Sequence, residues 1–364
     1  MKNKIRTVIT GTGSYIPTVK VKNEDFLDNE FYTPKGEKIT TPNEETISKF
    51  FKITGIAERR YVTNDLNASD IGYYAAKDAL ESSGIDKESI DYIIVAHNFG
   101  DISYEDRYSD FVPTLAGRIK KSLGIENPYC VATDLPFGCP GWLQGMIQAD
   151  IFLKAGAGKR AMVIGAETLS RISDPHDRDS MIYSDGAGAT ILESTEDDGK
   201  IGLLSHCTRS DTIQHAELLH MGNSYNPDHK KKNLYLKMEG HKLYKYAISK
   251  VPGVVKEALD EAELDLTDIS QIYIHQANEK MDEEILRRLF HLYGKEDITK
   301  EEIHSMMPMT ISYLGNSSVA TLPTLMDLTI KNQVTGHKFT SGEKIVFASV
   351  GAGMNINAAV YVIP

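Results

Sequence analysis

The sequence predicts an α/β protein with mostly parallel sheets, built from two consecutive α/β halves. Three observations support this prediction. Short apolar, β-rich runs alternate with longer helical patterns, the strand-like runs are continuous enough to be buried on both faces, and the alternation resumes after about residue 200 without a long Gly/Ser linker. With 364 residues, 41% of them hydrophobic, the chain can form one large or two moderate cores.

The first half shows the alternation most clearly. Strand-like runs such as "IDYIIVAHN" are separated by helical patterns such as "ASDIGYYAAKDALESSG". In chain order we expect a strand at 6–13, a helix at 68–84, strands at 90–98 and 128–135 around a helix at 114–125, a helix at 140–158 and a strand at 160–167. The segments 28–48 and 99–112 show neither pattern and are expected to be irregular cover segments.

The second half begins after "YSDGAGATILES" (183–194) and repeats the mixture of elements. In order we expect a strand at 200–208, a helix at 241–263, a strand at 271–278, helices at 282–294 and 317–332, and strands at 344–353 and 355–363. We therefore predict an N-terminal half at 1–200 and a C-terminal half at 201–364. Because no flexible linker separates them, the halves should share an interface.

Composition and charge argue against several classes of protein. The formal net charge is −11, from 51 acidic and 40 basic residues without a long single-sign block, which disfavours a nucleic-acid-binding protein. The three cysteines, at 130, 139 and 207, do not form a disulfide framework or a metal-ligand cluster, so no metal site and a reducing compartment are expected. The sequence shows no signal-peptide pattern and no run of about 18 apolar residues, so we expect a cytoplasmic protein without a membrane span.

The stretch "LPFGCPGW" (135–142) places Cys139 between two glycines and directly before a proline. A strand ending at about Asp134 and a helix beginning at Pro140 would hold the thiol at a helix N-terminus. Free N–H groups there favour the thiolate and can lower a thiol pKa from about 8.5 by one or more units. Proline suits the first helical position and disfavours a helical conformation in the residue before it. Local spacing leaves two interpretations open: a reactive thiol presented by the turn, or a small buried hydrophobic residue.

A nucleophile needs a base or a charge-stabilising partner, and two other segments offer candidates. The strand-like "QIYIHQAN" (271–278) ends in His275 and Asn278, and parallel strands build sites at their carboxyl ends. The stretch "YLGNSSVATLP" (313–323) places Asn316 at the start of another helix. The alternative interpretations are a hydrogen-bonded loop histidine and an ordinary helix N-cap.

Glycine-rich runs do not predict a nucleotide site. "GTGSYIP" lacks the third glycine of the dinucleotide fingerprint, and "LKAGAGKR" lacks both the first glycine of the phosphate loop and a hydroxyl residue after its lysine. "SDGAGA" and "SVGAGM" are interpreted as places where two backbones pass closely. The second of them could also direct backbone N–H groups at a developing oxyanion.

Taken together and in this order, six motifs and Cys139 resemble the ketoacyl-acyl-carrier-protein synthase III family, which are condensing enzymes of the thiolase superfamily. The motifs are "ITGTGSYIP", "TGIAERR", "DRDSMIYSDGAGA", "HQAN", "GNSS" and "VGAGMNINAAV", and they extend over nearly the whole chain. The resemblance implies a duplicated five-layer α/β/α/β/α thiolase-like fold, a homodimer and an active site between the halves. It also implies that Cys139, His275 and Asn316 are the catalytic residues.

The chemistry that the resemblance implies is a two-step acyl transfer. The Cys139 thiolate takes an acyl group from a thioester, with the backbone N–H groups of Cys139 and Ala352 as the oxyanion hole. A second thioester, typically malonyl on acyl carrier protein, loses carbon dioxide while His275 and Asn316 stabilise the enolate as neutral donors, and attack on acyl-Cys139 gives a β-ketoacyl product. No cofactor is expected to be tightly bound, since the acyl thioester of acyl carrier protein or of coenzyme A is a substrate.

Several matching positions bear on the acyl donor. Lys49 and Ile53 occupy the positions where family members that use a coenzyme A thioester as acyl donor have a tryptophan and an arginine. This difference disfavours the usual mode of coenzyme A binding. Arg178 matches an arginine at the cofactor mouth. Lys245 and Lys280 match basic positions associated with carrier docking, and local cations of this kind would attract an acidic carrier to an acidic protein. The resemblance therefore favours a donor carried by acyl carrier protein.

Two further features bear on the acyl pocket and the product. Phe111 matches the aromatic residue that the partner subunit inserts into the acyl pocket, although the preceding segment, 97–110, is longer than usual. The flank of Cys139 departs from the common family type, and "HNFGD" with "ASVGAGMNINA" resembles a bacterial group that includes ketosynthases of dialkylresorcinol or aryl-polyene products. These departures favour specialised lipid or polyketide condensation over the initiation of fatty acid biosynthesis.

Several uses of the site remain open on the sequence. One is elongation with a malonyl unit, and another is the joining of two β-ketoacyl units followed by ring closure. A non-condensing acyltransferase or an inactive partner subunit is a third interpretation, against which the intact Cys139, His275 and Asn316 argue. A thiol oxidoreductase is disfavoured because the chain has no Cys-x-x-Cys motif.

Overall fold

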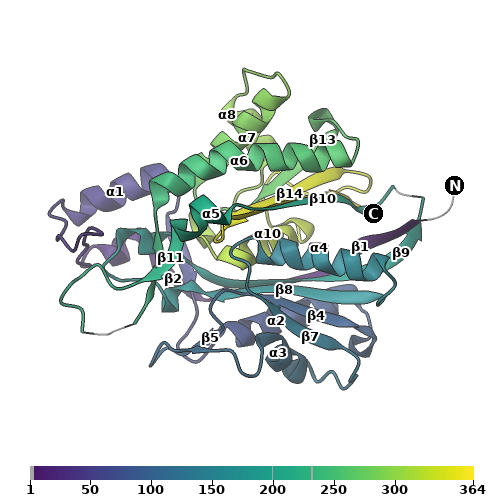
Figure 1. The fold of residues 1–364 in the computed structure, drawn as a ribbon, viewed down its shortest axis with the longest axis horizontal. Coiled ribbons are helices and arrows are strands. Elements are labelled where there is room, and N and C mark those ends of the chain that lie inside the picture. Colours follow the sequence, from purple (N-terminus) through teal and green to yellow (C-terminus); the bar gives the residue numbers. More distant parts are fainter. Residues whose placement is uncertain (1–3, 199, 231–232) are drawn as a thin grey trace.

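In a computed structural model, which describes residues 4–198, 200–230 and 233–364, the protein consists of five stacked layers (Figure 1). Two β-sheets alternate with three layers of helices. The lower helical layer contains α2 (Ala68–Ser83) and α3 (Leu115–Leu123), the middle layer α4 (Gly141–Lys154) and α10 (Thr321–Ile330), and the upper layer α6 (Gly240–Glu261) and α7 (Glu279–Leu292). The predicted α/β/α/β/α arrangement is confirmed.

Each sheet takes its strands from one part of the chain. The first has the order β1 (Lys4–Tyr15), β9 (Asp185–Asp197), β8 (Arg160–Thr168), β4 (Tyr92–Ala96) and β7 (Val131–Leu135). The second has the order β10 (Gly202–Ser210), β15 (Asn355–Val362), β14 (Lys344–Gly351) and β13 (Ile269–Ile274).

The prediction of mostly parallel sheets is wrong, because both sheets are mixed. Strands β7, β4 and β8 run parallel, as do β13 and β14, whereas β9 is antiparallel to both of its neighbours and β15 to both of its own. The reason is the connections: β8 reaches β9, and β14 reaches β15, without a helix that crosses the sheet, and strands joined in that way pair antiparallel. The parallel strands are the ones that end at the site described below.

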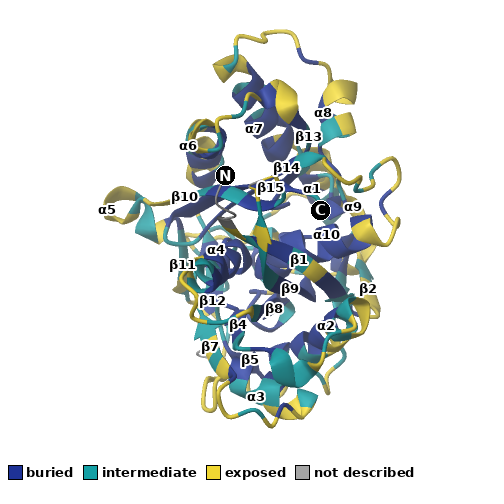
Figure 2. Ribbon diagram, turned by 90° about the vertical axis from the view of Figure 1, so that its right-hand side faces the viewer, coloured by how far each residue is buried: buried dark blue, intermediate teal, exposed yellow. Residues whose placement is uncertain are grey.

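Apolar side chains fill the spaces between the layers. The middle space is packed by Trp142 and Met146 of α4 and Leu325 of α10, together with Val163 of the first sheet and Phe347 of the second. Separate clusters lie between α2 and α3 and the first sheet, and between α6 and α7 and the second. Figure 2 shows the consequence, since α4, α10 and the inner strands of both sheets are largely buried while α6 and α8 carry exposed faces. The helix predicted at 140–158 is present as α4, and most of its residues are buried.

Short elements cover the ends of the sheets. They are the helices α1 (Asn43–Thr54), α5 (Thr212–His215), α8 (Lys300–Met306) and α9 (Ile311–Leu314) and the paired strands β2 (Val19–Lys22) with β3 (Glu58–Tyr61), β5 (Asp101–Ile102) with β6 (Ser109–Asp110), and β11 (Leu219–Gly222) with β12 (Tyr235–Met238). The expectation of irregular structure is wrong from Asn43 onward and at the two short strands β5 and β6. Pro42 before the helix and Glu44 and Glu45 in its first turn are favourable helix-start residues.

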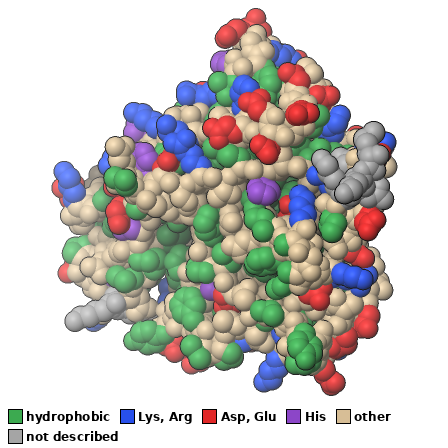
Figure 3. Space-filling model, turned by 45° about the vertical axis from the view of Figure 1, so that its right-hand side comes forward, with side chains coloured by type: hydrophobic (Ala, Val, Ile, Leu, Met, Phe, Trp, Pro, Cys, Tyr) green, Lys and Arg blue, Asp and Glu red, His purple; other side chains and the backbone are tan. Residues whose placement is uncertain are grey.

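Charged side chains are mixed on the surface rather than segregated by sign. On the face seen in Figure 3, acidic and basic side chains are interspersed over the upper part, while hydrophobic side chains gather in the lower part. Among the described residues, no helix has both the length and the apolar character needed to cross a membrane.

Candidate active site

A cavity of about 420 Å³ collects side chains from both sheets and from the segments between them. Cys139, His275 and Asn316 all line it, so the structure brings the three predicted catalytic residues together. Apolar side chains form much of the remaining wall, among them Phe99, Leu169, Leu219, Leu236, Met238, Leu243 and Met281. A reactive group at one point and an apolar wall around it suit a substrate with a hydrocarbon chain.

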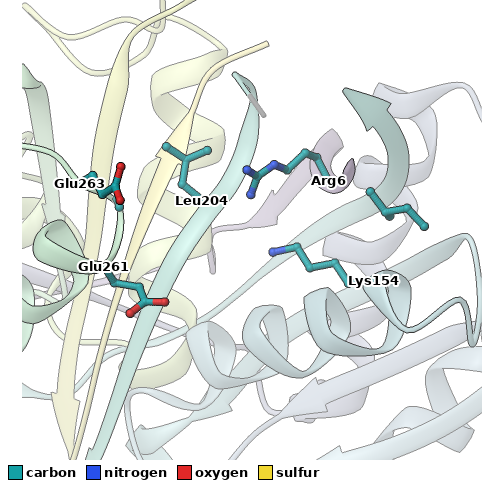
Figure 4. A pocket seen from close by; sticks show the side chains of 7 residues that line it. Arg6, Lys154, Leu204, Glu261 and Glu263 are labelled. Carbon is teal, nitrogen blue, oxygen red and sulfur yellow. The ribbon is translucent and has the colours of Figure 1, made fainter. Parts of the chain in front are cut away.

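A larger and more open depression, of about 610 Å³, lies elsewhere on the molecule (Figure 4). Arg6 and Lys154 project into it from one side, and Glu261 and Glu263 lie across from them. Its described lining residues include no cysteine, histidine or hydroxyl side chain. Size alone therefore does not identify the reactive site, and the smaller cavity is the better candidate.

Cys139 occupies the turn between β7 and α4. Gly138 has a φ of 68°, which is the left-handed region that glycine adopts readily, and the helix begins at Gly141 with Pro140 as its N-cap residue. The helix thus starts one residue later than predicted, and the thiol still lies at its N-terminal end. Trp142 points into the core between the sheets, where its ring packs edge-on against Phe347 with the ring centroids 5.8 Å apart, so it does not line the cavity.

The loop after β14 lies directly against this turn. A Cβ added to Gly351 would come 2.5 Å from the Cys139 backbone nitrogen, and one added to Gly138 would come 2.7 Å from the Ala352 nitrogen. Glycine at both positions is therefore required by the close approach of the two backbones. Neither the Cys139 nor the Ala352 N–H donates to a backbone carbonyl of the described residues. Two backbone N–H groups on adjoining turns, neither with a backbone acceptor, are the arrangement that an oxyanion hole needs.

Replacing Gly351 by alanine should displace this loop from Cys139. Because the new methyl group would also meet the Cys139 Cβ at 2.9 Å, we expect the rate of acylation of Cys139 to fall by about a hundredfold, the usual effect of a misplacement near 1 Å. Intact-mass spectrometry of the acylated protein measures that rate. The matched control is Gly253→Ala in α6, where an added Cβ meets nothing within 4 Å. Equal acylation rates in the two variants would contradict the close-approach argument.

His275 directly follows β13 at the carboxyl end of a parallel strand pair. Its backbone N–H donates to the Ala348 carbonyl of β14 at 2.9 Å, which fixes the residue beside the loop that carries Ala352. The side chain is 2% exposed, and burial lowers the pKa of His275 to about 4. The imidazole is therefore neutral at physiological pH, as predicted from the family chemistry.

Asn316 is held between the two halves of the chain. Its N–H donates to the Ile182 carbonyl at 3.1 Å, and its carbonyl accepts from the Ser184 N–H at 2.8 Å. The side-chain Oδ1 accepts from the Ser318 N–H at 2.8 Å, whereas Nδ2 donates to none of the described residues. The capping interpretation is wrong, because the 3-10 helix that follows has Ser317 as its N-cap and α10 has Ala320. The contact to Ser318 fixes Oδ1 and leaves Nδ2 available as a donor on a residue that lines the cavity.

The thiol has a polar partner that the sequence analysis did not single out. The Ser318 hydroxyl donates to Cys139 Sγ at 3.3 Å, and Asn98 Nδ2 in turn donates to Ser318 Oγ at 3.2 Å and to Glu167 Oε2 at 2.7 Å. Burial raises the pKa of the Cys139 thiol to about 11, and the charge of Glu167 adds to this, while the Ser318 hydroxyl opposes it. This direction differs from the lowering expected at a helix N-terminus, because burial outweighs the helix end in the closed site.

The residues expected to bind the donor or its carrier lie outside the cavity. Arg178 is exposed at the start of a short 3-10 helix, and Lys245 on α6 and Lys280 on α7 are exposed as well. Lys49 is exposed on α1. Phe111 is 45% exposed, and its ring centroid lies 5.8 Å from that of His97. The structure thus places these side chains at the surface of the single chain. None of them lines the cavity that holds Cys139, His275 and Asn316.

The chain is similar to known proteins along almost its whole length. Residues 133–212 match the family model of 3-oxoacyl-[acyl-carrier-protein (ACP)] synthase III, and residues 259–363 match the model of the C-terminal part of that enzyme. The β-ketoacyl-[acyl-carrier-protein] synthase III of Erythrobacter litoralis (strain HTCC2594) is 30% identical over 357 residues, which cover 98% of each chain.

Solved structures give the same result. The 3-oxoacyl-[acyl-carrier-protein] synthase III of Aquifex aeolicus VF5 superposes with a TM-score of 0.79 at 27% identity, covering 98% of this chain and 99% of that one. The corresponding enzyme of Thermus thermophilus superposes with a TM-score of 0.80 at 26% identity and the same coverage.

Proposed function

Because the chain belongs to the 3-oxoacyl-[acyl-carrier-protein] synthase III family of condensing acyltransferases, we propose that it joins two acyl units through an acyl-Cys139 intermediate. The observation that carries the proposal is the meeting of Cys139, His275 and Asn316 in one largely apolar cavity, beside two backbone N–H donors that have no backbone acceptor. A nucleophile, an oxyanion hole and neutral side-chain donors are what a thioester condensation requires.

The first step proposed is transfer of the acyl group to Cys139. The sulfur attacks the thioester carbonyl, and the N–H groups of Cys139 and Ala352 hold the oxygen as it becomes negative. The bond between the carbonyl carbon and the donor sulfur then breaks. The donor leaves as a free thiol with the proton that Cys139 gave up, so the step needs no other reactant.

The second step proposed is carbon–carbon bond formation. A malonyl thioester loses carbon dioxide, and the electron pair left behind forms an enolate at the thioester oxygen. His275 and Asn316 Nδ2 donate to that oxygen, for which the neutral state of His275 is suitable. The carbanion attacks the acyl carbon, the bond to Cys139 sulfur breaks, and the thiol recovers a proton.

We propose acyl carrier protein as the source of at least one thioester. Lys245 and Lys280 are exposed cations on neighbouring helices of the upper layer, and exposed Arg178 adds a third positive charge. On a protein of net charge −11, local cations of this kind are needed to attract an acidic carrier. The lack of the expected tryptophan and arginine at Lys49 and Ile53 argues in the same direction.

We also propose that the enzyme is a homodimer whose chains each divide into 1–200 and 201–364. Tyr129 and Val131 are exposed at the start of the edge strand β7, and Tyr104, Tyr108, Phe111 and Val112 are exposed in the segment that follows the neighbouring strand β4. Exposed apolar side chains of this kind near an open sheet edge support pairing with a second copy. In that pairing, Phe111 would be the side chain that each copy contributes to the acyl pocket of the other. The division near residue 200 is supported by the separate strand content of the two sheets.

Incubation with a panel of acyl and β-ketoacyl thioesters, on carrier protein and on coenzyme A, tests the function directly. Intact-mass spectrometry should show one added acyl group that maps to Cys139. No adduct with any donor would overturn the proposal. Adding malonyl carrier then separates the two uses, since elongation consumes it, whereas a ring product formed without it would show the joining of two β-ketoacyl units and exclude simple elongation.

Reversing the charge of Lys245 and Lys280 tests carrier docking. We expect the variant with both lysines replaced by glutamate to raise the KM for the acyl carrier substrate about tenfold, with little change in acylation by a coenzyme A thioester. Steady-state kinetics at low and moderate salt measure this effect. Lys121→Glu reverses one lysine charge on α3 in the opposite outer layer, as each of the two replacements does on its own helix, and should leave the KM unchanged. An effect of Lys121→Glu equal to that of either single replacement would contradict docking at α6 and α7.

A further inference from the structure

A hydrogen-bonded chain of side chains leads away from the sulfur of Cys139 into the first sheet. It runs from Ser318, which contacts Sγ at 3.3 Å, through Asn98 at 3.2 Å to the carboxylate of Glu167 at 2.7 Å. Asn98 follows β4 and Glu167 lies near the end of β8, so both sit at carboxyl ends of parallel strands, as Cys139 does after β7. The two-step mechanism uses neither Ser318, Asn98 nor Glu167.

The donors in this chain have a fixed direction. Glu167 Oε2 accepts from both the backbone N–H and the Nδ2 of Asn98, at 3.1 and 2.7 Å, which sets the orientation of the amide because its oxygen would be repelled by the carboxylate. The other hydrogen of Nδ2 is given to Ser318 Oγ. With that oxygen occupied as an acceptor, the hydroxyl hydrogen of Ser318 is left to point at the sulfur.

The backbone of Ser318 is adapted to this contact. Its φ is 53°, a left-handed conformation that few residues other than glycine adopt, and its N–H is bound by Asn316 Oδ1 at 2.8 Å. The neighbouring Ser317 has an ordinary φ of −95°, and its hydroxyl lies 3.5 Å from that of Thr321, away from the thiol. The turn therefore directs one of two adjacent serines to the sulfur.

We propose that Ser318 is a further catalytic residue, whose hydroxyl donates to Cys139 Sγ and stabilises the thiolate, and that Asn98 and Glu167 are positioning residues that aim this hydroxyl. The inference rests on the proposed role of Cys139 as the nucleophile. A hydrogen bond to a charged group contributes more stabilising free energy than one to a neutral group. The Ser318 hydroxyl should therefore stabilise the thiolate more than the thiol, which lowers the pKa of Cys139.

The charged and titratable groups around the sulfur explain why such a donor is needed. Glu167 disfavours the thiolate by its charge, and burial raises its own pKa to about 7, with His97 and Asp185 also facing it. Tyr183 and His275 line the same cavity, and burial raises the pKa of Tyr183 and lowers that of His275, so both are neutral at physiological pH. Among the described side chains, the Ser318 hydroxyl is the one that hydrogen-bonds to the sulfur.

The test is the pH dependence of alkylation of Cys139 by iodoacetamide in the full chain, followed by peptide mass spectrometry so that Cys130 and Cys207 are counted separately. In this reaction the thiolate sulfur bonds to the reagent carbon, iodide leaves, and the thiol proton passes to the buffer. Ser318→Gly removes the hydroxyl and suits the left-handed backbone. We expect it to raise the thiol pKa by about one unit and to lower the alkylation rate near pH 8 about tenfold.

Three further variants separate this role from a structural one. Ser317→Ala removes a hydroxyl one residue away and should leave the thiol pKa unchanged. Asn98→Leu should raise it, and combining it with Ser318→Gly should add little, because Asn98 acts through Ser318. Glu167→Gln keeps an oxygen for Asn98 and removes a negative charge, so it should not raise the thiol pKa.

An unchanged thiol pKa in Ser318→Gly, or a fully additive double variant, would overturn the proposal. The assay contains no acyl thioester. A normal shift in a protein that forms no acyl adduct would therefore refute the proposed function, while the stabilisation of the Cys139 thiolate by Ser318 would still hold.

Discussion

Replacement of Cys139 by alanine is expected to reduce condensation by on the order of 10⁵-fold, the scale of effect seen when a covalent nucleophile is removed. Decarboxylation of the malonyl thioester should continue in the same variant. The physical reason is that His275 and Asn316 Nδ2, which we assign to the enolate, do not depend on the sulfur for their positions: one is fixed by Ala348 and the other by Ser318. Release of carbon dioxide and formation of the β-ketoacyl product, followed in parallel, measure the two activities.

His275→Ala and Asn316→Ala should give the opposite pattern. Each removes one donor to the enolate oxygen, so decarboxylation should fall by about 10²- to 10³-fold. Acylation of Cys139 should persist, because its oxyanion donors are the backbone N–H groups of Cys139 and Ala352. Circular dichroism checks that each variant is folded. If Cys139→Ala, His275→Ala and Asn316→Ala abolished decarboxylation and condensation equally, the assignment of separate roles to the sulfur and to the two donors would be wrong.

Replacement of Lys237 by methionine is expected to lower the free energy of unfolding by about 3–5 kcal/mol. Lys237 is 2% exposed, and its Nζ lies 2.6 Å from Asp174 Oδ2, 3.2 Å from Asp177 Oδ2 and 3.4 Å from the centroid of the Tyr225 ring. Removing the ammonium leaves two carboxylates in the interior without their counter-ion. Urea unfolding followed by circular dichroism measures the change.

The loss of stability in Lys237→Met should depend on pH in a known direction. Burial raises the pKa of Asp177 even beside the ammonium, and without the ammonium it rises further. A carboxyl group whose pKa is raised in the folded state makes the folded protein more stable as the pH falls. The loss of unfolding free energy in Lys237→Met should therefore be smaller at pH 5 than at pH 8. Lys20→Met, at an exposed site on β2, should change stability by less than about 0.5 kcal/mol. A deficit independent of pH would contradict the ion-pair explanation.

The buried ion pairs of Lys237 with Asp174 and Asp177 also hold a strand that forms part of the cavity wall. Side chains alternate along β12, so that Leu236 and Met238 line the cavity while Lys237 between them points to the two aspartates. Loosening this strand should therefore disturb the wall that contacts the hydrocarbon part of a substrate. Nothing in the local sequence "NLYLKM" predicts a buried lysine, because its partners lie about 60 residues earlier.

Much of the fold follows from local patterns, and the errors have physical causes. The alternation of strands and helices predicted the elements, but strand direction depends on how β8 joins β9 and β14 joins β15, which periodicity does not contain. The sequence does not predict the start of α1, because its start signals, Pro42 and Glu44, directly follow a segment with no periodic pattern. The thiol pKa was expected to fall because a helix end is visible in sequence, whereas burial is a property of the assembled layers.

The structure brings Cys139, His275 and Asn316 to one cavity, as the sequence predicted, but the polar residues behind Cys139 were not predicted. The rule that selected His275, a polar residue at the carboxyl end of a buried strand, also applies to "IDYIIVAHN" and "RAMVIGAE", which end in Asn98 and Glu167. Ser318 lies two residues after Asn316 in the same motif. That these three meet beneath Cys139 depends on contacts across up to 220 positions of the chain, which spacing does not reveal.

The two backbone hydrogen bonds that join Asn316 to Ile182 and Ser184 bear on how the enzyme is made. They connect positions more than 130 residues apart, and they form only when the second part of the chain has reached the first. During synthesis, the turn with Cys139 emerges long before its donors exist. Closing such long loops is entropically costly and belongs to the late stages of folding. A newly made chain therefore carries Cys139, its proposed nucleophile, for some time before Asn316 is held in place beside it.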